Sequence, residues 1–243
     1  MPAYNLLAIE TSTERLSLAI QRSDRLFACE VDAGQRHSEL ALPMMHALLD
    51  EAALTLSDLD VIAFGQGPGS FTGVRIACGL TQGLALGLGK RVMPVATQMA
   101  LAEQCGAEKV IVALDARMGE IYFAAYERSQ DATGWSAVVA PMLVKPDKLP
   151  AIAGELWCGI GSAFDVPTLM PHLSARYGAP LGRIVTNALP GAREVAIIAA
   201  RQIAQFGLNI ALEPEFAAPL YLRNKVAMTI AERAEQKMKR VSA

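Results

Sequence analysis

The chain has 243 residues, of which 52% are hydrophobic and 19% are charged, and its formal net charge is -2. This length fits one large domain or two small ones, and the apolar content is enough to build a substantial core. A protein that binds nucleic acid by itself usually carries a basic stripe, and none is evident in this sequence. We therefore expect contact with nucleic acid only through a partner.

The cysteines, the first residues and the apolar runs bear on where in the cell the protein is expected. The four cysteines stand outside any C-x-x-C pair, so neither a zinc knuckle nor a redox motif is indicated; they are Cys29, Cys78, Cys105 and Cys158. The start "MPAYNLLAIETS" lacks the basic segment of a secretory signal. The longest uncharged apolar run, Ile76–Gly89, is too short for a membrane span. We expect a cytoplasmic protein with reduced thiols and no membrane partner.

The first half of the chain predicts strands followed by alternating helices and strands. Asn5–Glu10, Leu16–Arg22 and "DRLFACEVDA" have the pattern of three strands with short links, which is typical of an antiparallel meander. The segment "HSELALPMMHALLDEAALTL" has helical spacing. We expect Pro43 near the first turn of that helix, because an interior proline costs about 3 kcal/mol. A strand at Val61–Phe64, a glycine-rich turn and a helix at about Val74–Leu88 complete the order β-β-β-α-β-α.

The second half repeats this order of elements without repeating the sequence. "KVIVALDARMGEIYFAAYER" predicts two strands around a turn at Arg117–Glu120, and "AVVAPMLVKPDKL" predicts a third strand. "LWCGIGSAF" predicts a strand that ends in a glycine turn, and "GAREVAIIAARQIAQFG" predicts an amphipathic helix.

Two lobes that each open with a meander fit the α/β architecture shared by actin, sugar kinases and Hsp70, with a mixed sheet in each lobe. We expect the lobes at residues 1–104 and 105–223. A helix predicted over residues 224–243 is a candidate addition to the first lobe.

The first candidate site is "FGQGPGSFTGVR", Phe64–Arg75. It is not a Walker A motif, because no lysine lies near, and it lacks the third glycine of a dinucleotide fingerprint. Its place between a strand and a helix suits an anion, which the free N–H groups and the dipole of a helix N-terminus attract. We predict Ser70 or Thr72 as the N-cap and weak anion binding by Gly67, Gly69, Ser70 and Thr72. The alternative is a tight turn that needs glycine for its backbone shape alone.

Two hairpin turns are further candidates. In "ETSTER", the acid Glu10 closes a strand and hydroxyls follow, so Glu10, Thr11 and Ser12 are candidates to hold magnesium and a phosphate. Asp115 begins the equivalent hairpin of the second half, and the turn residues Arg117–Glu120 are candidates because exposed turns often carry function. An ordinary polar turn is the alternative at both places.

Histidines are scarce and give no catalytic or metal prediction. His37, His46 and His172 form no close pair, and no Ser/His/Asp set with argued geometry is evident. His37 stands at a predicted helix start beside Ser38 and Glu39, where we expect it to cap the helix and face solvent.

A glycine stripe marks the helix that follows the glycine-rich turn. Three glycines recur every four residues there, and each costs about 1 kcal/mol of helix propensity relative to alanine. Residues with this spacing share one face, along which another helix can approach closely. The preceding helix adds Met and Leu side chains of the kind found at adaptable interfaces. We predict a partner surface, with a core internal to this chain as the alternative; its residues are Leu40, Met44, Leu48, Ile76, Gly79, Leu80, Gly83, Leu84 and Gly87.

The sequence resembles the TsaB (YeaZ) family over nearly its whole length. The motifs that carry the resemblance are "LLAIETSTERLSLAI", "RHSELALPMM", "GQGPGSFTGVRI", "LDARMGEIYFAAY" and the late "PLYLR", Pro219–Arg223. The resemblance implies the two-lobed actin/Hsp70-like (ASKHA, ribonuclease H-like) fold. It also implies a non-catalytic scaffold subunit required for N6-threonylcarbamoyladenosine (t6A) beside the anticodon of tRNAs that read codons beginning with A.

The same resemblance implies partners. TsaB-like proteins dimerise with and activate TsaD, a paralogue that carries the metal site and transfers the threonylcarbamoyl group, and the ATPase TsaE joins the pair. The tRNA is then reached only through the complex, and ATP or ADP at the TsaD interface is the one candidate cofactor. A homodimer is expected when TsaD is absent, because a large apolar patch should not stay exposed.

The metal histidines of TsaD-type sequences align at about Thr97 and Leu101 here, and neither residue suits a metal. We therefore expect no metal and no catalytic residue. Two rival functions stay open on the sequence. An ATP-dependent small-molecule kinase shares the fold, but no general base is obvious and the second lobe is compact. A glycoprotease-like hydrolase is disfavoured by the missing histidine pair.

Overall fold

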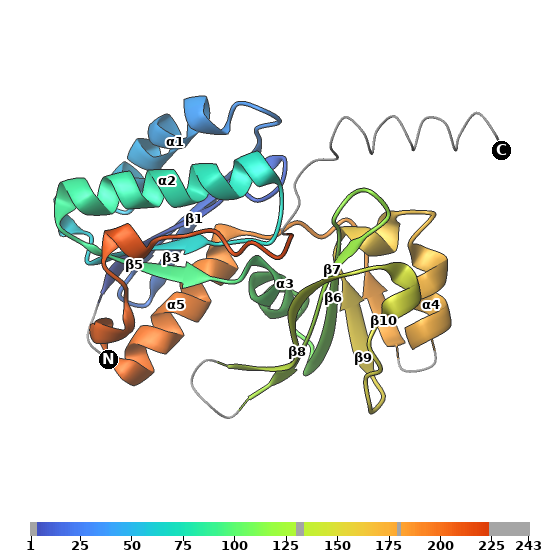
Figure 1. Ribbon diagram of the computed structural model, residues 1–243. Coiled ribbons are helices and arrows are strands. Elements are labelled where there is room, and N and C mark those ends of the chain that lie inside the picture. The colour runs from blue at the N-terminus through green and yellow to red at the C-terminus, as the bar shows by residue number, and fades with distance from the viewer. Residues whose placement is uncertain (1–3, 130–133, 179–180, 224–243) are drawn as a thin grey trace.

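The protein is built on two five-stranded mixed sheets (Figure 1). This computed structural model describes residues 4–129, 134–178 and 181–223. The first sheet has the order β3-β2-β1-β4-β5, and the second has the order β10-β9-β6-β7-β8. In each sheet the three meander strands pair antiparallel and the two later strands add in parallel. The predicted repeat of element order is therefore confirmed.

The bounds of the elements follow the predicted segments closely. The first half comprises β1 (Asn5–Glu10), β2 (Arg15–Arg22), β3 (Arg25–Asp32), α1 (His37–Glu51), β4 (Val61–Gly65), α2 (Phe71–Leu88), β5 (Arg91–Val95) and α3 (Thr97–Cys105). The second half comprises β6 (Lys109–Asp115), β7 (Ile121–Arg128), β8 (Trp135–Val144), β9 (Trp157–Ile160), α4 (Met170–Tyr177), β10 (Leu181–Val185) and α5 (Ala192–Phe206). The elements β5, α3, α4 and β10 were not predicted from the sequence. The helix predicted over 224–243 lies outside the described residues.

Alternation along β1 shows how the first sheet is covered. Leu7 and Ile9 point to the face under α1 and α2, whereas Leu6 and Ala8 point to the face under α5. All four side chains are buried, because helices cover both faces of this sheet. In Figure 1, α1 and α2 lie together on one side of the first sheet and α5 lies on the other.

The helices that end the two halves are exchanged between the lobes. α5 packs on β1 and β2, and its residues Val195, Ala196 and Ala199 join the core of the first sheet. α3 packs on β6 and β9, where Leu101 joins the core of the second sheet. The predicted boundary at 104/105 therefore does not hold for these two helices. The two also contact each other and occupy the junction between the sheets (Figure 1).

Pro43 lies inside α1 and not near its first turn as predicted. Helix α1 begins at His37, so Pro43 is its seventh residue and cannot donate a hydrogen bond to the carbonyl of Glu39. Pro43, its neighbour Leu42 and Glu39 are exposed, so the Glu39 carbonyl that loses its N–H donor lies on the side of the helix that is open to water. Solvent can then replace part of the hydrogen bond that an interior proline removes.

Helix α2 is longer than predicted. It begins at Phe71 rather than Val74 and runs for 18 residues. Among the described residues it is the one helix whose length and mean hydropathy of 1.2 would suffice to cross a membrane. Core helices meet the same criterion, and α2 packs on β4 of the first sheet.

A cluster of charges around Glu103 of α3 ties the two lobes together. Its carboxylate accepts hydrogen bonds from Arg201 of α5 at 3.0 Å, from Arg128 of β7 at 2.8 Å and from the Trp135 indole at 2.6 Å. Burial acts to raise the pKa of Glu103, but the hydrogen bonds from Arg201 and Trp135 and the two cations outweigh it and hold the pKa below its usual value.

Glu103→Ala should lower the free energy of unfolding by about 2–3 kcal/mol at pH 7, because two guanidinium groups and an indole lose their acceptor. A carboxylate with a lowered pKa stabilises the fold above its unfolded pKa, so the difference from wild type should shrink as the pH falls below about 4. Urea unfolding at several pH values measures both effects. Gln104→Ala, the exposed next residue, is the control; equal losses for the two variants would contradict the role of the cluster.

Candidate functional site

A cleft of about 1020 Å³ lies where the two lobes face each other. Its walls come from the first hairpin turn, the glycine-rich turn and start of α2, the second hairpin turn, and the segment 220–223. Its size suits a small-molecule ligand. The second lobe, which the sequence predicts to be compact, still contributes Asp115, Arg117 and Tyr122 to the lining of this cleft.

The predicted anion-binding residues divide into two groups. Ser12, Gly69, Ser70 and Thr72 line the cleft, whereas Glu10, Thr11 and Gly67 do not. Asp115 and Arg117 of the second hairpin also line it. The first-turn N–H groups of a helix lack intrahelical acceptors, so the start of α2 offers donors to this space. As predicted, Ser70 is the N-cap of α2, and its hydroxyl accepts a hydrogen bond from the Gly73 N–H at 3.4 Å.

The glycines of the turn permit a close approach between two backbones. The Ser70 N–H donates to the Ser12 carbonyl at 2.7 Å, and the Thr11 hydroxyl donates to the Gly73 carbonyl at 2.8 Å. A Cβ atom on Gly69 would lie 2.6 Å from the Ser12 Cβ, and one on Gly73 would collide with the Thr11 carbonyl. The glycine-rich turn therefore needs glycine to pack against the first hairpin, whatever ligand it holds.

Glu10 is buried behind this contact rather than presented to the cleft. Its carboxylate accepts hydrogen bonds from the Ser12 N–H at 2.6 Å and from the Thr97 hydroxyl at 3.0 Å. Burial raises the pKa of Glu10 above its ordinary value against the hydrogen bonds that lower it. The Thr97 hydroxyl also accepts from the Gly67 N–H at 3.1 Å. The hydrogen bonds that link Glu10, Thr97 and Gly67 therefore hold the glycine-rich turn in place from its buried side.

The segment 220–223 joins the two lobes across the cleft. The Leu220 N–H donates to the Gln66 carbonyl of the glycine-rich turn at 2.7 Å. Arg223 donates to the Glu120 carboxylate at 2.6 Å and to the Ala116 carbonyl at 3.1 Å in the second hairpin. The motif "PLYLR" was quoted only for the family resemblance, and Arg223 was not predicted as part of the site.

His37 is buried and not solvent-facing as predicted. It is 5% exposed, lines the cleft, and has no hydrogen-bond partner at Nε2 among the described residues. The N-cap of α1 is Arg36, and no side chain of a described residue caps that helix end. His37 is close to the cleft because α1 begins directly after the loop that carries Gly34 and Gln35, which line the same space.

The predicted partner surface is partly exposed and partly core. Gly79, Gly83 and Gly87 of α2 are exposed, and a Cβ atom on any of them would meet no described atom within 4 Å. Leu40 and Met44 of α1, with Leu80 and Leu84 of α2, are half-buried and pack against the core of the first sheet; Ile76 is also half-buried. Leu48 is 2% exposed, so it belongs to the core and not to a surface. No described residue packs against these three glycines, so within the described residues the glycine stripe has no partner in this chain.

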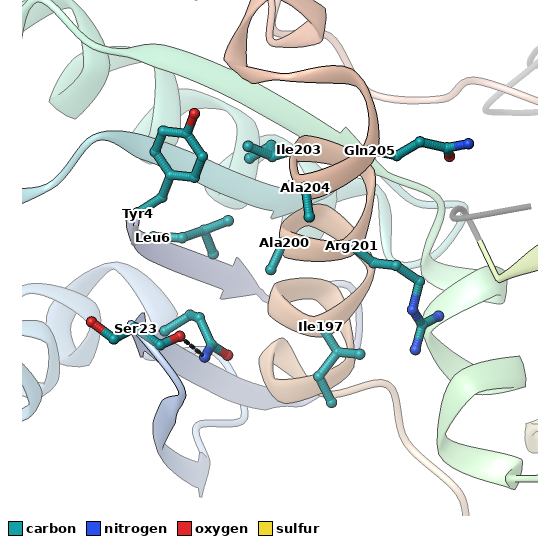
Figure 2. Close-up of a pocket in the computed structure, with 10 residues that line it drawn as sticks. Tyr4, Leu6, Ser23, Ile197, Ala200, Arg201, Ile203, Ala204 and Gln205 are labelled. Atoms are coloured by element: carbon teal, nitrogen blue, oxygen red, sulfur yellow. Dashed lines mark hydrogen bonds between the residues drawn. The ribbon is translucent and has the colours of Figure 1, made fainter. Parts of the chain in front are cut away.

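A second hollow of about 520 Å³ lies beside α5 (Figure 2). Tyr4, Leu6, Ile203 and Ala200 lie on one side of the helix, and Arg201 points away to the other side, where it pairs with Glu103. The hollow is therefore mostly apolar, and we assign it no chemistry.

Comparison with known proteins places this architecture in a family. A family model described as TsaD, tRNA N6-adenosine threonylcarbamoyltransferase, matches residues 31–231. The tRNA threonylcarbamoyladenosine biosynthesis protein TsaB of Escherichia coli (strain K12) is 35% identical over 232 residues, which cover 91% of this chain and 96% of that protein. The chain belongs to the TsaB (YeaZ) family.

Further relatives agree with membership of the TsaB family. The TsaB protein of Haemophilus influenzae is 32% identical over 93% of this chain and 96% of its own. A solved structure described as YeaZ from Pseudomonas aeruginosa is 34% identical, has a TM-score of 0.76 and covers 90% of this chain and 100% of that chain. A second, described as similar to peptidase YeaZ from the same organism, reaches 0.81 at the same identity and coverage. Together with the two repeated sheets, these likenesses confirm the predicted two-lobed ASKHA fold.

Gly73→Ala and Gly79→Ala should change stability in opposite directions, although both glycines lie in α2. The first places a methyl group against the Thr11 backbone and should cost about 1–3 kcal/mol in the free energy of unfolding. The second enters open space and should add up to about 1 kcal/mol through helix propensity. Urea unfolding of the two variants beside wild type measures this. A Gly73→Ala variant as stable as Gly79→Ala would show that the close approach is not required.

Proposed function

We propose that this protein is a non-catalytic subunit required for t6A formation in tRNA, and that it acts by dimerising with and activating a TsaD-type paralogue. The observation that carries the proposal is the open glycine stripe on α2. Membership of the TsaB family supplies the pathway, and the match of a TsaD model to residues 31–231 supports a fold shared between this chain and TsaD-type proteins. Two related folds can pair through equivalent helices with approximate two-fold symmetry.

The geometry of α2 supports a helix–helix contact. Glycine is poor in a helix, and the three exposed glycines with one spacing lower the helix propensity of α2 without packing against any described residue. They leave a shallow channel in which a second helix can lie with its backbone close. Leu86 of α2 is 59% exposed, and Leu42 of α1 is 46% exposed. An apolar surface of this kind indicates an interaction site.

The side chains at the positions of the TsaD metal histidines support a non-catalytic role. Thr97 is buried and engaged with Glu10 and Gly67, and Leu101 is buried in the core of the second sheet. Neither side chain is a metal ligand of the kind that a transferase of this type would use. We infer that the reacting groups are supplied by the paralogue and that this chain stabilises the active arrangement.

The remaining parts of the proposal follow from the same pairing. The protein is cytoplasmic, forms a homodimer through the α1/α2 surface when the paralogue is absent, and reaches tRNA only within the complex. TsaE joins the pair as its ATPase. Any ATP or ADP would lie in the cleft near Ser12, Gly69 and Ser70, where the complex closes over the start of α2.

Gly83→Leu should abolish co-purification with a TsaD-type partner, because a leucine fills the channel on α2. Gly83→Ala is the matched control: both changes raise helix propensity, by up to about 1 kcal/mol, but only leucine obstructs the approach of a helix. Tagged co-purification and size-exclusion chromatography measure pairing, and circular dichroism checks the monomer fold. Undisturbed pairing of a folded Gly83→Leu variant would refute the proposed surface.

Depletion of the protein in its own cells should lower t6A in bulk tRNA several-fold, and the wild-type chain should restore it. Mass spectrometry of tRNA nucleosides measures the level. An unchanged t6A level would overturn the assignment to this pathway.

The isolated chain should also fail to turn over Mg-ATP with small-molecule acceptors. Micromolar binding of Mg-ATP with turnover would instead favour a kinase of the same fold.

A further inference from the structure

Two cysteines that stand far apart in the sequence meet where α3 ends against the second sheet. The Cys105 thiol, on the last residue of α3, lies 2.8 Å from the Cys158 sulfur on β9. A disulfide bond is about 2.04 Å long, so the sulfurs have less than about 1 Å to close. Cys105 is 6% exposed and Cys158 is 2% exposed. The absence of a C-x-x-C pair had indicated no redox motif, but the fold brings two distant thiols together.

An arginine side chain makes the two sulfurs unequal. Arg183, on the edge strand β10, places Nε 3.3 Å from the Cys158 sulfur and donates through Nη2 to the Cys105 carbonyl at 2.7 Å. A guanidinium group beside a thiol favours the thiolate. Cys105 lies at the C-terminal end of α3, where the helix dipole disfavours negative charge. The geometry therefore favours a thiolate at Cys158 and a neutral thiol at Cys105.

The titration directions agree with this arrangement. The hydrogen bond from Cys105 and the contact with Arg183 lower the pKa of Cys158, and the same sulfur pair together with burial raises the pKa of Cys105. The other two thiols differ from this pair. Burial and the nearby Glu51 raise the pKa of Cys29, and the Cys78 thiol lies 3.2 Å from the Ala217 carbonyl.

We propose that Cys105 and Cys158 form a redox site, which hydrogen peroxide oxidises to a disulfide that ties the end of α3 to strand β9. The Cys158 thiolate attacks one peroxide oxygen, an S–O bond forms, the O–O bond breaks, and the departing hydroxide takes up a proton to become water. The Cys105 sulfur then attacks the Cys158 sulfur, and the hydroxyl leaves as water with the Cys105 proton. Two thiols lose two electrons and one peroxide becomes two waters. A small dithiol reduces the disulfide back to two thiols by exchange and becomes a cyclic disulfide itself.

The position of the pair gives the disulfide a structural consequence. α3 begins at Thr97, which holds Glu10 and the glycine-rich turn, and it carries Glu103, which binds both lobes. A covalent bond at Cys105 would fasten the other end of this helix to the second sheet. The oxidised protein would then hold its two lobes together more firmly than the reduced protein.

The full-length wild-type protein tests the site directly. Native protein treated with hydrogen peroxide should lose two thiols per chain, and a non-reducing digest should contain the Cys105 and Cys158 peptides joined and lighter by two hydrogen atoms. Dithiothreitol should restore both thiols. The oxidised form should melt about 5–10 °C higher, because the bond closes a long loop. Oxidation of Cys29 or Cys78 without a Cys105–Cys158 link, or an unchanged melting temperature of the linked form, would overturn the proposal.

Two variants separate the role of the cation from the thiol pair. Arg183→Met keeps a side chain of similar length without charge and should slow formation of the link several-fold. Arg193→Met, on an exposed residue of α5, is the control and should leave the rate unchanged. Cys105→Ala should stop the reaction at a sulfenic acid on Cys158 that dimedone traps. Equal rates for the two arginine variants would refute the role of Arg183, and the absence of trapped Cys158 would refute its role as the attacking thiolate.

Discussion

The contact between the first hairpin turn and the start of α2 is the constraint on which the rest of the site depends. Thr11 and Ser12 reach the backbone of α2 through two hydrogen bonds, and Gly69 and Gly73 leave the room that they need. Behind this contact, the buried Glu10 and Thr97 hold the turn at Gly67. Because Thr97 is the first residue of α3, the position of the junction helix follows from the position of the glycine-rich turn.

Helix α3 connects the glycine-rich turn to the second lobe. Glu103 binds Arg128 of the second sheet and Arg201 of α5, and Cys105 meets Cys158 of β9. α5 returns to cover the first sheet. Each lobe therefore provides a helix that completes the core of the other, and this exchange holds the two walls of the cleft relative to each other. The segment from Leu220 to Arg223 lines this cleft and is hydrogen-bonded to both lobes.

The order of the elements could be predicted because period-2 and helical patterns are local. The exchange of α3 and α5 could not, because both faces of β1 are apolar and an amphipathic helix does not reveal which sheet it covers. Pro43 was misplaced because its cost depends on whether the freed carbonyl faces water. In the site, Ser70 was found from its cap pattern, whereas the buried His37 and the distant Arg223 required the tertiary structure. The thiol pair was missed because 53 positions separate the two cysteines.

The glycines of this region show why one sequence signal could suggest two sites. Gly69 and Gly73 face inward and are required by a backbone contact in the same chain, whereas Gly79 and Gly83 face open space on the same helix. A phosphate turn and a helix-packing stripe both favour glycine, so composition alone cannot separate them. Their burial separates them: the inward glycines form part of the cleft wall, whereas no described residue packs against the outward glycines. The partner helix that we propose would pack on the outward glycines, directly beside the cleft that the inward glycines shape.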